Sequence, residues 1–174
     1  MTELGELISS RLRDVPDFPQ AGVLFKDITP LLADPVAFAG CVDALAALPA
    51  VAAADLIAGV EARGFIVAAA LARAVGAGMV PVRKAGKLPP PTVRASYQLE
   101  YGSAEIEIPT GVVDGRSVFV VDDVLATGGT MAATVDLLGR AGATVTGVGV
   151  LIELSFLGGR ARLTDLEPIA LLVL

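Results

Sequence analysis

The order of apolar and polar positions along the chain predicts helices that alternate with strands. Residues 2–13 carry apolar side chains at helical spacing, and Pro16 and Pro19 end this helix. The same pattern predicts further helices over residues 35–48, 65–75 and 130–140, and short apolar strands over residues 56–60, 80–83, 117–121, 144–151 and 169–174. Strands without alternating polar positions are typical of a parallel sheet that is buried on both faces. The pattern therefore predicts an α/β fold, an open, mostly parallel sheet flanked by helices.

Two segments depart from this alternation. Residues 25–32 form an irregular apolar segment before the second helix. Residues 84–95, KAGKLPPPTVRA, contain three prolines and several cations without an apolar period. This composition excludes a core element and favours a mobile loop or lid, because structureless loops of this length are usually functional. Residues 97–101 and 105–108 then predict a hairpin that leaves the loop.

Length and composition narrow the class of protein. The chain has 174 residues, and no linker or internal repeat divides it, so we expect a single domain over residues 1–174. Apolar residues make up 54% of the sequence, which excludes a disordered chain. The longest apolar runs are far shorter than the ~20 residues that a membrane helix needs. The start of the chain lacks the basic and apolar regions of a signal peptide, so a cytoplasmic location is expected.

Charge and missing residue types exclude several chemistries. The chain has one cysteine, Cys41, and no histidine. A disulfide framework, a Cys/His zinc site and a histidine-based triad are therefore excluded. The formal charge of −6 argues against a general nucleic-acid surface.

The most informative stretch is VFVVDDVLATGGT, residues 118–130. A buried strand delivers Asp122 and Asp123, and the turn 127–130 opens a helix. Backbone N–H groups, hydroxyls and the positive helix end meet at this turn, and its glycines let the backbone approach a ligand closely, so it is suited to a phosphate. The carboxylates upstream are placed to accept hydrogen bonds from sugar hydroxyls or to lie near a metal. The alternatives are the metal-binding acidic pair of response-regulator receivers, which occurs near the N-terminus instead, and a simple threonine cap.

The spacing of four apolar residues, two acidic residues, four variable residues and TGGT resembles the signature of the type I phosphoribosyltransferases. Four more segments resemble the adenine branch of that family: residues 18–35, 59–65, 82–92 and 96–108. The resemblance covers about residues 16–154. It implies the type I phosphoribosyltransferase fold, with an N-terminal helix and base-binding hood over residues 1–35 and a lid loop and hairpin over residues 84–108.

The resemblance also implies an activity. Enzymes of this branch transfer the 5-phosphoribosyl group from 5-phosphoribosyl-1-pyrophosphate to adenine and release AMP and pyrophosphate, a reaction of purine salvage. Mg²⁺ is the implied cofactor, held mainly by substrate and water and not by a dedicated set of protein ligands. A homodimer is implied, without a nucleic-acid or membrane partner.

Roles follow for the residues that match the family's phosphate and sugar motifs. Asp122 and Asp123 are expected to bind the ribose hydroxyls. The 5′-phosphate is expected to bind the turn of Ala126, Thr127, Gly128, Gly129 and Thr130. The loop expected to meet the pyrophosphate, with a non-proline cis peptide, consists of Glu61, Ala62, Arg63 and Gly64. Further cationic contacts are expected from Arg83, Lys84 and Lys87.

The base is expected to lie against the segment around Phe25. By the resemblance, the Phe25 ring stacks on adenine and the backbone of Leu24 and Lys26 pairs with its Watson–Crick edge. Glu100 is expected to hold or shuttle a proton of the base, and Tyr101 to close over the site. Without the resemblance, Phe25 would be interpreted as a core residue and Glu100 as a solvent-facing charge.

Departures from the family pattern and two other functions stay open at this point. Ala62 stands where many relatives have serine, Lys26 where arginine is common, and residues 89–91 make the lid stiffer than usual. A phosphoribosyltransferase for another base would usually bind that base nearer the C-terminus. A sensor of phosphoribosyl pyrophosphate that regulates transcription would need a DNA-binding extension, which this acidic sequence lacks.

Overall fold

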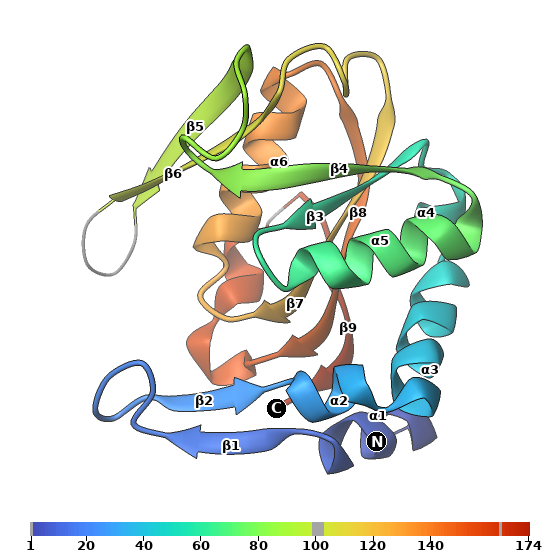
Figure 1. Ribbon diagram of the computed structural model, residues 1–174, viewed down its shortest axis with the longest axis vertical. Helices are drawn as coiled ribbons and strands as arrows, with labels where there is room; N and C mark the ends of the chain where they lie inside the picture. The colour runs from blue at the N-terminus through green and yellow to red at the C-terminus, as the bar shows by residue number, and fades with distance from the viewer. Residues whose placement is uncertain (1, 99–102, 164) are drawn as a thin grey trace.

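The structure is a computed structural model that describes residues 2–98, 103–163 and 165–174. Its main sheet has the strand order β5-β6-β4-β3-β7-β8-β9 (Figure 1). In chain order the strands are β3 (Leu56–Val60), β4 (Gly78–Lys84), β5 (Thr92–Gln98), β6 (Ser103–Pro109), β7 (Ser117–Leu125), β8 (Thr144–Glu153) and β9 (Ile169–Val173). The run from β4 through β3, β7 and β8 to β9 is parallel, whereas β6 is antiparallel to both β4 and β5. The expectation of a mostly parallel sheet is confirmed.

Helices cover both faces of this sheet (Figure 1). One face packs against α1 (Glu3–Ser10), α2 (Thr29–Ala33), α3 (Pro35–Ala46), α4 (Pro49–Ala52) and α5 (Gly64–Val75), and the other against α6 (Gly129–Arg140). Neighbouring residues of β7 alternate between the two cores: Phe119 belongs to the α1–α5 side, while Val118 and Val120 pack with Leu137 of α6. In the described part of the chain, no helix combines the length and apolarity needed to cross a membrane.

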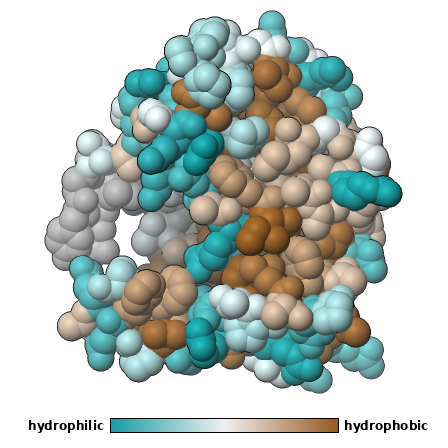
Figure 2. All heavy atoms as spheres, viewed as in Figure 1, coloured by the Kyte–Doolittle hydropathy of each residue, from teal (hydrophilic) through white to brown (hydrophobic). Residues whose placement is uncertain are grey.

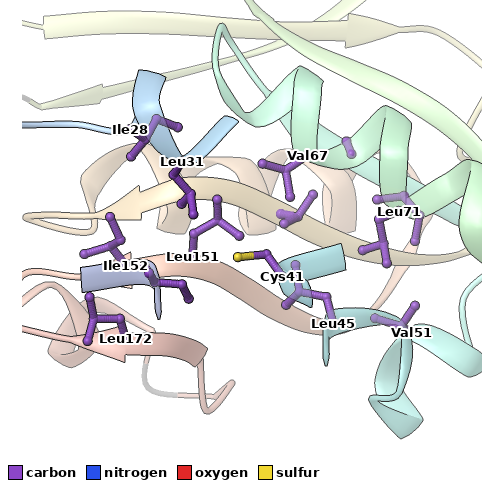
Figure 3. Packing of buried hydrophobic residues seen from close by; sticks show 14 of the residues in the cluster. Ile28, Leu31, Cys41, Leu45, Val51, Val67, Leu71, Leu151, Ile152 and Leu172 are labelled. Carbon is purple, nitrogen blue, oxygen red and sulfur yellow. The ribbon is translucent and has the colours of Figure 1, made fainter. Parts of the chain in front are cut away.

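The core on the α1–α5 side consists almost entirely of aliphatic side chains (Figure 3). The residues labelled there are Ile28, Leu31, Cys41, Leu45, Val51, Val67, Leu71, Leu151, Ile152 and Leu172. Burial raises the pKa of the Cys41 thiol to about 11, so this cysteine acts as a small apolar side chain. In the space-filling view, apolar residues also gather over α5 and over the hairpin of β1 (Arg13–Pro16) and β2 (Leu24–Asp27) (Figure 2).

The N-terminal region differs from the prediction. The helix predicted over residues 2–13 ends at Ser10, and residues 13–16 form β1 (Arg13–Pro16). This strand pairs antiparallel with β2 (Leu24–Asp27). An ion pair of 2.6 Å joins Arg13 to Asp27 across the pair. These long-range contacts stabilise a strand at the end of the segment, where the local apolar pattern alone predicts a helix. Part of the irregular segment 25–32 is therefore regular, in β2 and α2.

The prediction of a loop over residues 84–95 is wrong at its C-terminal end. Strand β5 starts at Thr92, pairs with β6 in the register Thr92 to Pro109, and buries Ala95 against the core that contains α6. Residues 92–98 form a strand because they have a cross-strand partner and bury one face. Neither feature can be predicted from the local composition. The predicted hairpin has longer strands, and its predicted first strand, 97–101, falls partly outside the described residues.

The other elements match the prediction with shifted ends. Strands β4, β7 and β8 are each longer than predicted. Three short helices were not predicted: α4 and the 3₁₀ helices η1 (Ser155–Leu157) and η2 (Gly159–Arg162). The second long helix begins where expected, because the Asp34 carboxylate accepts hydrogen bonds from the N–H groups of Val36 and Ala37, both at 3.0 Å.

We expect Gly149→Ala to destabilise the sheet. A Cβ atom at Gly149 of β8 would lie 2.8 Å from the Phe119 ring, which is fully buried and has no room to move. Overpacking of this kind costs about 1–3 kcal/mol. In Gly139→Ala, at an exposed position of α6, the new Cβ meets nothing within 4 Å, and helix propensity predicts a gain of about 0.5–1 kcal/mol. Urea unfolding of both variants measures the difference, and equal midpoints would contradict the expectation.

Candidate active site

The candidate site lies where two neighbouring parallel strands end. Strand β3 leads into the loop of Glu61, Ala62 and Arg63 before α5, and β7 leads into the turn 126–128 before α6. Because β3 and β7 pair in parallel, these two connections emerge at the same edge of the sheet. Ligands of open α/β sheets bind beyond the carboxyl ends of the strands. The peptide bond between Glu61 and Ala62 is cis, as the family resemblance implies.

A cavity of about 560 Å³ lies over this edge. Its lining comes from the hood, the loop after β3, the end of β7 and the segment after β8: Gly22, Val23, Leu24, Phe25, Lys26, Glu61, Ala62, Arg63, Asp122, Asp123, Val124, Ala126, Leu154, Phe156 and Leu157. The volume and the mixture of apolar walls with a few charged groups suit a small organic ligand.

A second, smaller cavity of about 90 Å³ adjoins the first at Asp122 and Ala126. The turn from Ala126 to Met131 forms most of its wall. Gly128 precedes α6 with a φ of 77°, which favours glycine, and a Cβ there would collide with the carbonyl oxygen of Gly159. The turn thus presents backbone N–H groups at the start of a twelve-residue helix, the geometry that binds phosphate.

Arg63 joins the two ends of the large cavity. Its Nε atom lies 2.7 Å from Oδ2 of Asp123, and its guanidinium lies 4.9 Å from the centre of the Phe25 ring. Phe18 meets Phe25 edge-on, with 5.1 Å between the ring centres. The arrangement places a cation between the aromatic hood and the acidic pair, with 38% of its side chain still exposed.

The acidic pair has an unusual electrostatic environment. Asp123 is 4% exposed, and its Oδ2 atom is the one buried side-chain oxygen or nitrogen in the described residues without a hydrogen bond, since the nearby Arg63 is not aligned to donate one. Burial, and then the adjacent Asp123 charge, raise the pKa of Asp122 well above its usual value. A Cβ at Gly64 would lie 2.7 Å from Oδ1 of Asp122, so glycine is required at this first residue of α5.

Glu61 connects the cis-peptide loop to β4. Its Oε2 atom accepts hydrogen bonds from Arg83 Nε at 3.2 Å and from the Lys84 N–H at 2.9 Å. Burial acts to raise the pKa of Glu61, but these donors lower it below the usual value. Arg83 also donates to the carbonyl oxygen of Lys87 at 2.9 Å. Arg83 therefore braces the two loops together.

The structure brings most of the predicted residues into one site. Around the large cavity lie Leu24, Phe25, Lys26, Glu61, Ala62, Arg63, Asp122, Asp123 and Ala126, and around the small one Thr127, Gly128, Gly129 and Thr130. Gly64, Arg83, Lys84 and Lys87 line neither cavity. The Lys26 side chain pairs with Asp14 at 2.7 Å. The predicted Glu100 and Tyr101 lie outside the described residues.

Two parts of the site were missed. Leu154, Phe156 and Leu157 line the large cavity from η1 and the residue before it. Tyr97 of β5 and Thr130 share a hydrogen bond of 3.1 Å between their hydroxyl oxygens, which joins the hairpin to the turn 126–130. For the cavity wall, the available signal in the sequence was the group of apolar residues beside glycines after the strand at 144–151. For the bond between Tyr97 and Thr130, the sequence offered no signal.

Comparisons with known proteins agree with this geometry. The family described as "Phosphoribosyl transferase domain" matches residues 49–165. The adenine phosphoribosyltransferase of Streptomyces avermitilis is 60% identical over 167 residues, 94% of this chain and 92% of that protein. The crystal structure of adenine phosphoribosyltransferase from Rhodothermus marinus has a TM-score of 0.93 at 44% identity and covers 98% of both chains. The Saccharomyces cerevisiae enzyme, solved with an imino-altritol bisphosphate and adenine, has a TM-score of 0.84 at 35% identity and also covers 98% of both.

A mostly parallel sheet with an acidic pair and a glycine-rich turn at its carboxyl edge, together with these matches, defines a phosphoribosyltransferase of type I. The similarity to several relatives extends over nearly the whole chain, hood included. The chain belongs to the adenine phosphoribosyltransferases, which are pentosyltransferases of purine salvage.

We expect Asp122→Asn to unfold at higher urea concentration than the parent at neutral pH. Because the folded-state pKa of Asp122 lies above its ordinary value of 3.8, the native state binds more protons than the unfolded state, and ionisation destabilises it as the pH rises. The amide avoids this cost and can still accept the hydrogen bond from the Asp123 N–H. Removing such functional strain typically gains about 0.5–2 kcal/mol.

The gain should shrink as the pH falls through the raised folded-state pKa of Asp122 and should vanish only below its ordinary value of 3.8, where the carboxyl group is neutral in both states. Asp136→Asn, at an exposed position of α6, is the matched control, with an expected change within about 0.5 kcal/mol at every pH. A variant that is less stable than the parent at neutral pH would refute this account of Asp122.

Proposed function

We propose that the chain makes AMP and pyrophosphate from adenine and 5-phosphoribosyl-1-pyrophosphate with the residues gathered around these two cavities. The observation that carries the proposal is Arg63, which contacts both the aromatic hood at Phe25 and the acidic pair at Asp123. One cavity therefore joins an apolar end for a flat base to a polar end for a phosphorylated sugar.

The sugar end binds phosphoribosyl pyrophosphate. The turn 126–130 accepts the 5′-phosphate on its N–H groups and on the hydroxyls of Thr127 and Thr130. The ribose hydroxyls donate to Asp122 and Asp123, and Oδ2 of Asp123 is supported in this role because it is buried without a hydrogen bond in the described structure. The Tyr97 hydroxyl, bonded to Thr130, helps to fix that hydroxyl.

The apolar end binds adenine. Phe25 offers a ring face, and Leu154, Phe156 and Leu157 form the wall contributed by the C-terminal part of the chain. The backbone of Leu24 and Lys26 supplies the polar edge that distinguishes adenine from the other purines. The Lys26 side chain is held by Asp14, so only its backbone is assigned this role.

The residues present fit Mg²⁺ as a cofactor held chiefly by the substrate. No group of three or more carboxylate, histidine or cysteine side chains in the described ranges is arranged to hold a metal ion. Mg²⁺ commonly binds one or two carboxylates together with substrate phosphates, and the acidic pair offers that number. When bound, the ion would neutralise part of the negative charge of the pyrophosphate.

Bond breaking at the anomeric carbon leaves negative charge on the pyrophosphate. Arg63 lies between the base and sugar ends and stabilises that charge as it develops. Lys84 at the end of β4 and Lys87 in the loop after it contribute further positive charge. Glu100 holds a proton of the base and Tyr101 covers the base, as the resemblance implies. We also propose that two copies of the chain form a homodimer.

Pyrophosphate release with one base at a time tests the proposed function. The protein receives phosphoribosyl pyrophosphate, Mg²⁺ and adenine, hypoxanthine, guanine, xanthine, uracil or orotate in separate reactions. We expect turnover with adenine alone. Turnover with another base would leave the sugar site in place and overturn the base assignment, and no turnover with any base would favour a sensor.

We expect Phe25→Leu to raise the KM for adenine by about three- to tenfold, because leucine keeps the apolar contact and loses aromatic stacking. The KM for phosphoribosyl pyrophosphate should change by less than about twofold. Phe18→Leu is the control, since Phe18 touches the Phe25 ring from its edge and does not line the cavity. Equal KM values for adenine in the two variants would remove Phe25 from the base site.

A further inference from the structure

Glu107 is a fully buried carboxylate outside the two cavities. It lies in β6, and its side chain is 0% exposed. Its Oε1 atom accepts hydrogen bonds from the N–H groups of Lys87 and Leu88, both at 2.9 Å. Its Oε2 atom accepts from Thr92 Oγ1 and Arg94 Nε, both at 3.0 Å. Two of the four donors thus belong to the backbone of the loop after β4.

A buried charge is costly unless it is paired and fully hydrogen-bonded. Burial acts to raise the pKa of Glu107, but the hydrogen bonds from Leu88, Thr92 and Lys87 and the charge of Arg94 lower it. The carboxylate therefore stays ionised at neutral pH and binds its donors strongly. An aliphatic residue would fill this position in a sheet at less cost if packing were its only purpose.

The same loop is held from its other side. The carbonyl oxygen of Lys87 accepts a hydrogen bond from Arg83 at 2.9 Å, and Arg83 pairs with Glu61 at 3.2 Å. Glu61 lines the large cavity and precedes the cis peptide bond. The backbone of Lys87 is therefore fixed at both its N–H and its C=O, with only two hydrogen bonds between it and the cavity wall.

We propose that Glu107 is a positioning residue, which holds the backbone of Lys87 so that the Lys87 side chain reaches the pyrophosphate of the substrate. This rests on the proposed function, in which Lys87 contacts that group. A lysine on a freely moving loop would lose backbone and side-chain entropy on binding. Glu107 removes the backbone part of that loss in the free enzyme. In this proposal the backbone around Lys87 is prearranged for the substrate, through the hydrogen bonds that Glu107 and Arg83 make with it.

Steady-state kinetics of Glu107→Gln test the proposal. Glutamine keeps the shape but offers an NH₂ group where two donors already point. We expect the KM for phosphoribosyl pyrophosphate to rise about tenfold and the KM for adenine to change by less than about twofold. Glu105→Gln is the matched control, because Glu105 lies on the same strand with its side chain 40% exposed and 3.7 Å from Arg94. Both of its KM values should stay within about twofold of the parent.

A double-mutant cycle with Lys87→Ala separates positioning from general stability. If Glu107 acts through Lys87, Glu107→Gln raises the KM for phosphoribosyl pyrophosphate no further in the Lys87→Ala background. Independent, multiplying effects, or equal increases in both KM values, would overturn the proposal. Adenine turnover that fails in the parent would refute the proposed function instead, and Lys87→Ala without effect would refute the role of Lys87.

Thr92→Val provides a milder variant in case Glu107→Gln does not fold. It removes one of the four donors and leaves the carboxylate paired with Arg94. We expect the KM for phosphoribosyl pyrophosphate to rise by about two- to threefold, and the KM for adenine to stay unchanged. An unchanged KM for phosphoribosyl pyrophosphate in every folded variant of this cluster would also overturn the proposal.

Discussion

The parallel pairing of β3 with β7 is the constraint on which the site depends. It brings the cis-peptide loop and the acidic pair to the same edge of the sheet, and this adjacency requires close approach of the backbones. At Gly64 a side chain would strike Asp122, and at Gly59 a Cβ would lie 2.6 Å from Ala68. The small residues let α5 begin directly against the end of β7, so Arg63 reaches Asp123.

This edge concentrates charge that the fold does not neutralise by itself. Asp122 and Asp123 are adjacent and at least partly buried, and within the described ranges the cation paired with Asp123 is Arg63, with 38% of its side chain exposed. In the core of a protein such an arrangement would be destabilising. In the proposed function this arrangement is useful, because the hydroxyls of the sugar phosphate and its accompanying cation supply the missing partners. Under that proposal, folding stability is exchanged for binding, as in many functional sites.

From the sequence, the residues at this edge of the sheet are easier to predict than the contacts that surround them. Asp122, Asp123 and the glycine-rich turn follow one strand within a few residues, so local pattern suffices to place them together. The brace formed by Arg83 and Glu61, and the four hydrogen bonds of Glu107, join residues 13 to 22 positions apart. Their basic and proline-rich neighbourhood indicates only a polar loop. Strand β1 was missed for the same reason. It is stabilised by pairing with β2 and by the ion pair of Arg13 with Asp27, whereas its local sequence continues a helical pattern.

The segment after β8 contacts the walls of both cavities. Gly159 packs so closely on the carbonyl of Ala126 and on Gly128 that neither glycine has room for a side chain. The same segment carries Phe156 and Leu157 into the wall of the large cavity. Arg160 anchors it to Glu153 at 3.1 Å and to the carbonyl oxygen of Pro168 at 2.7 Å. The turn 126–130 and this part of the cavity wall are therefore parts of one packed unit. In the proposed function, that unit sets the distance between the phosphate and base ends of the ligand.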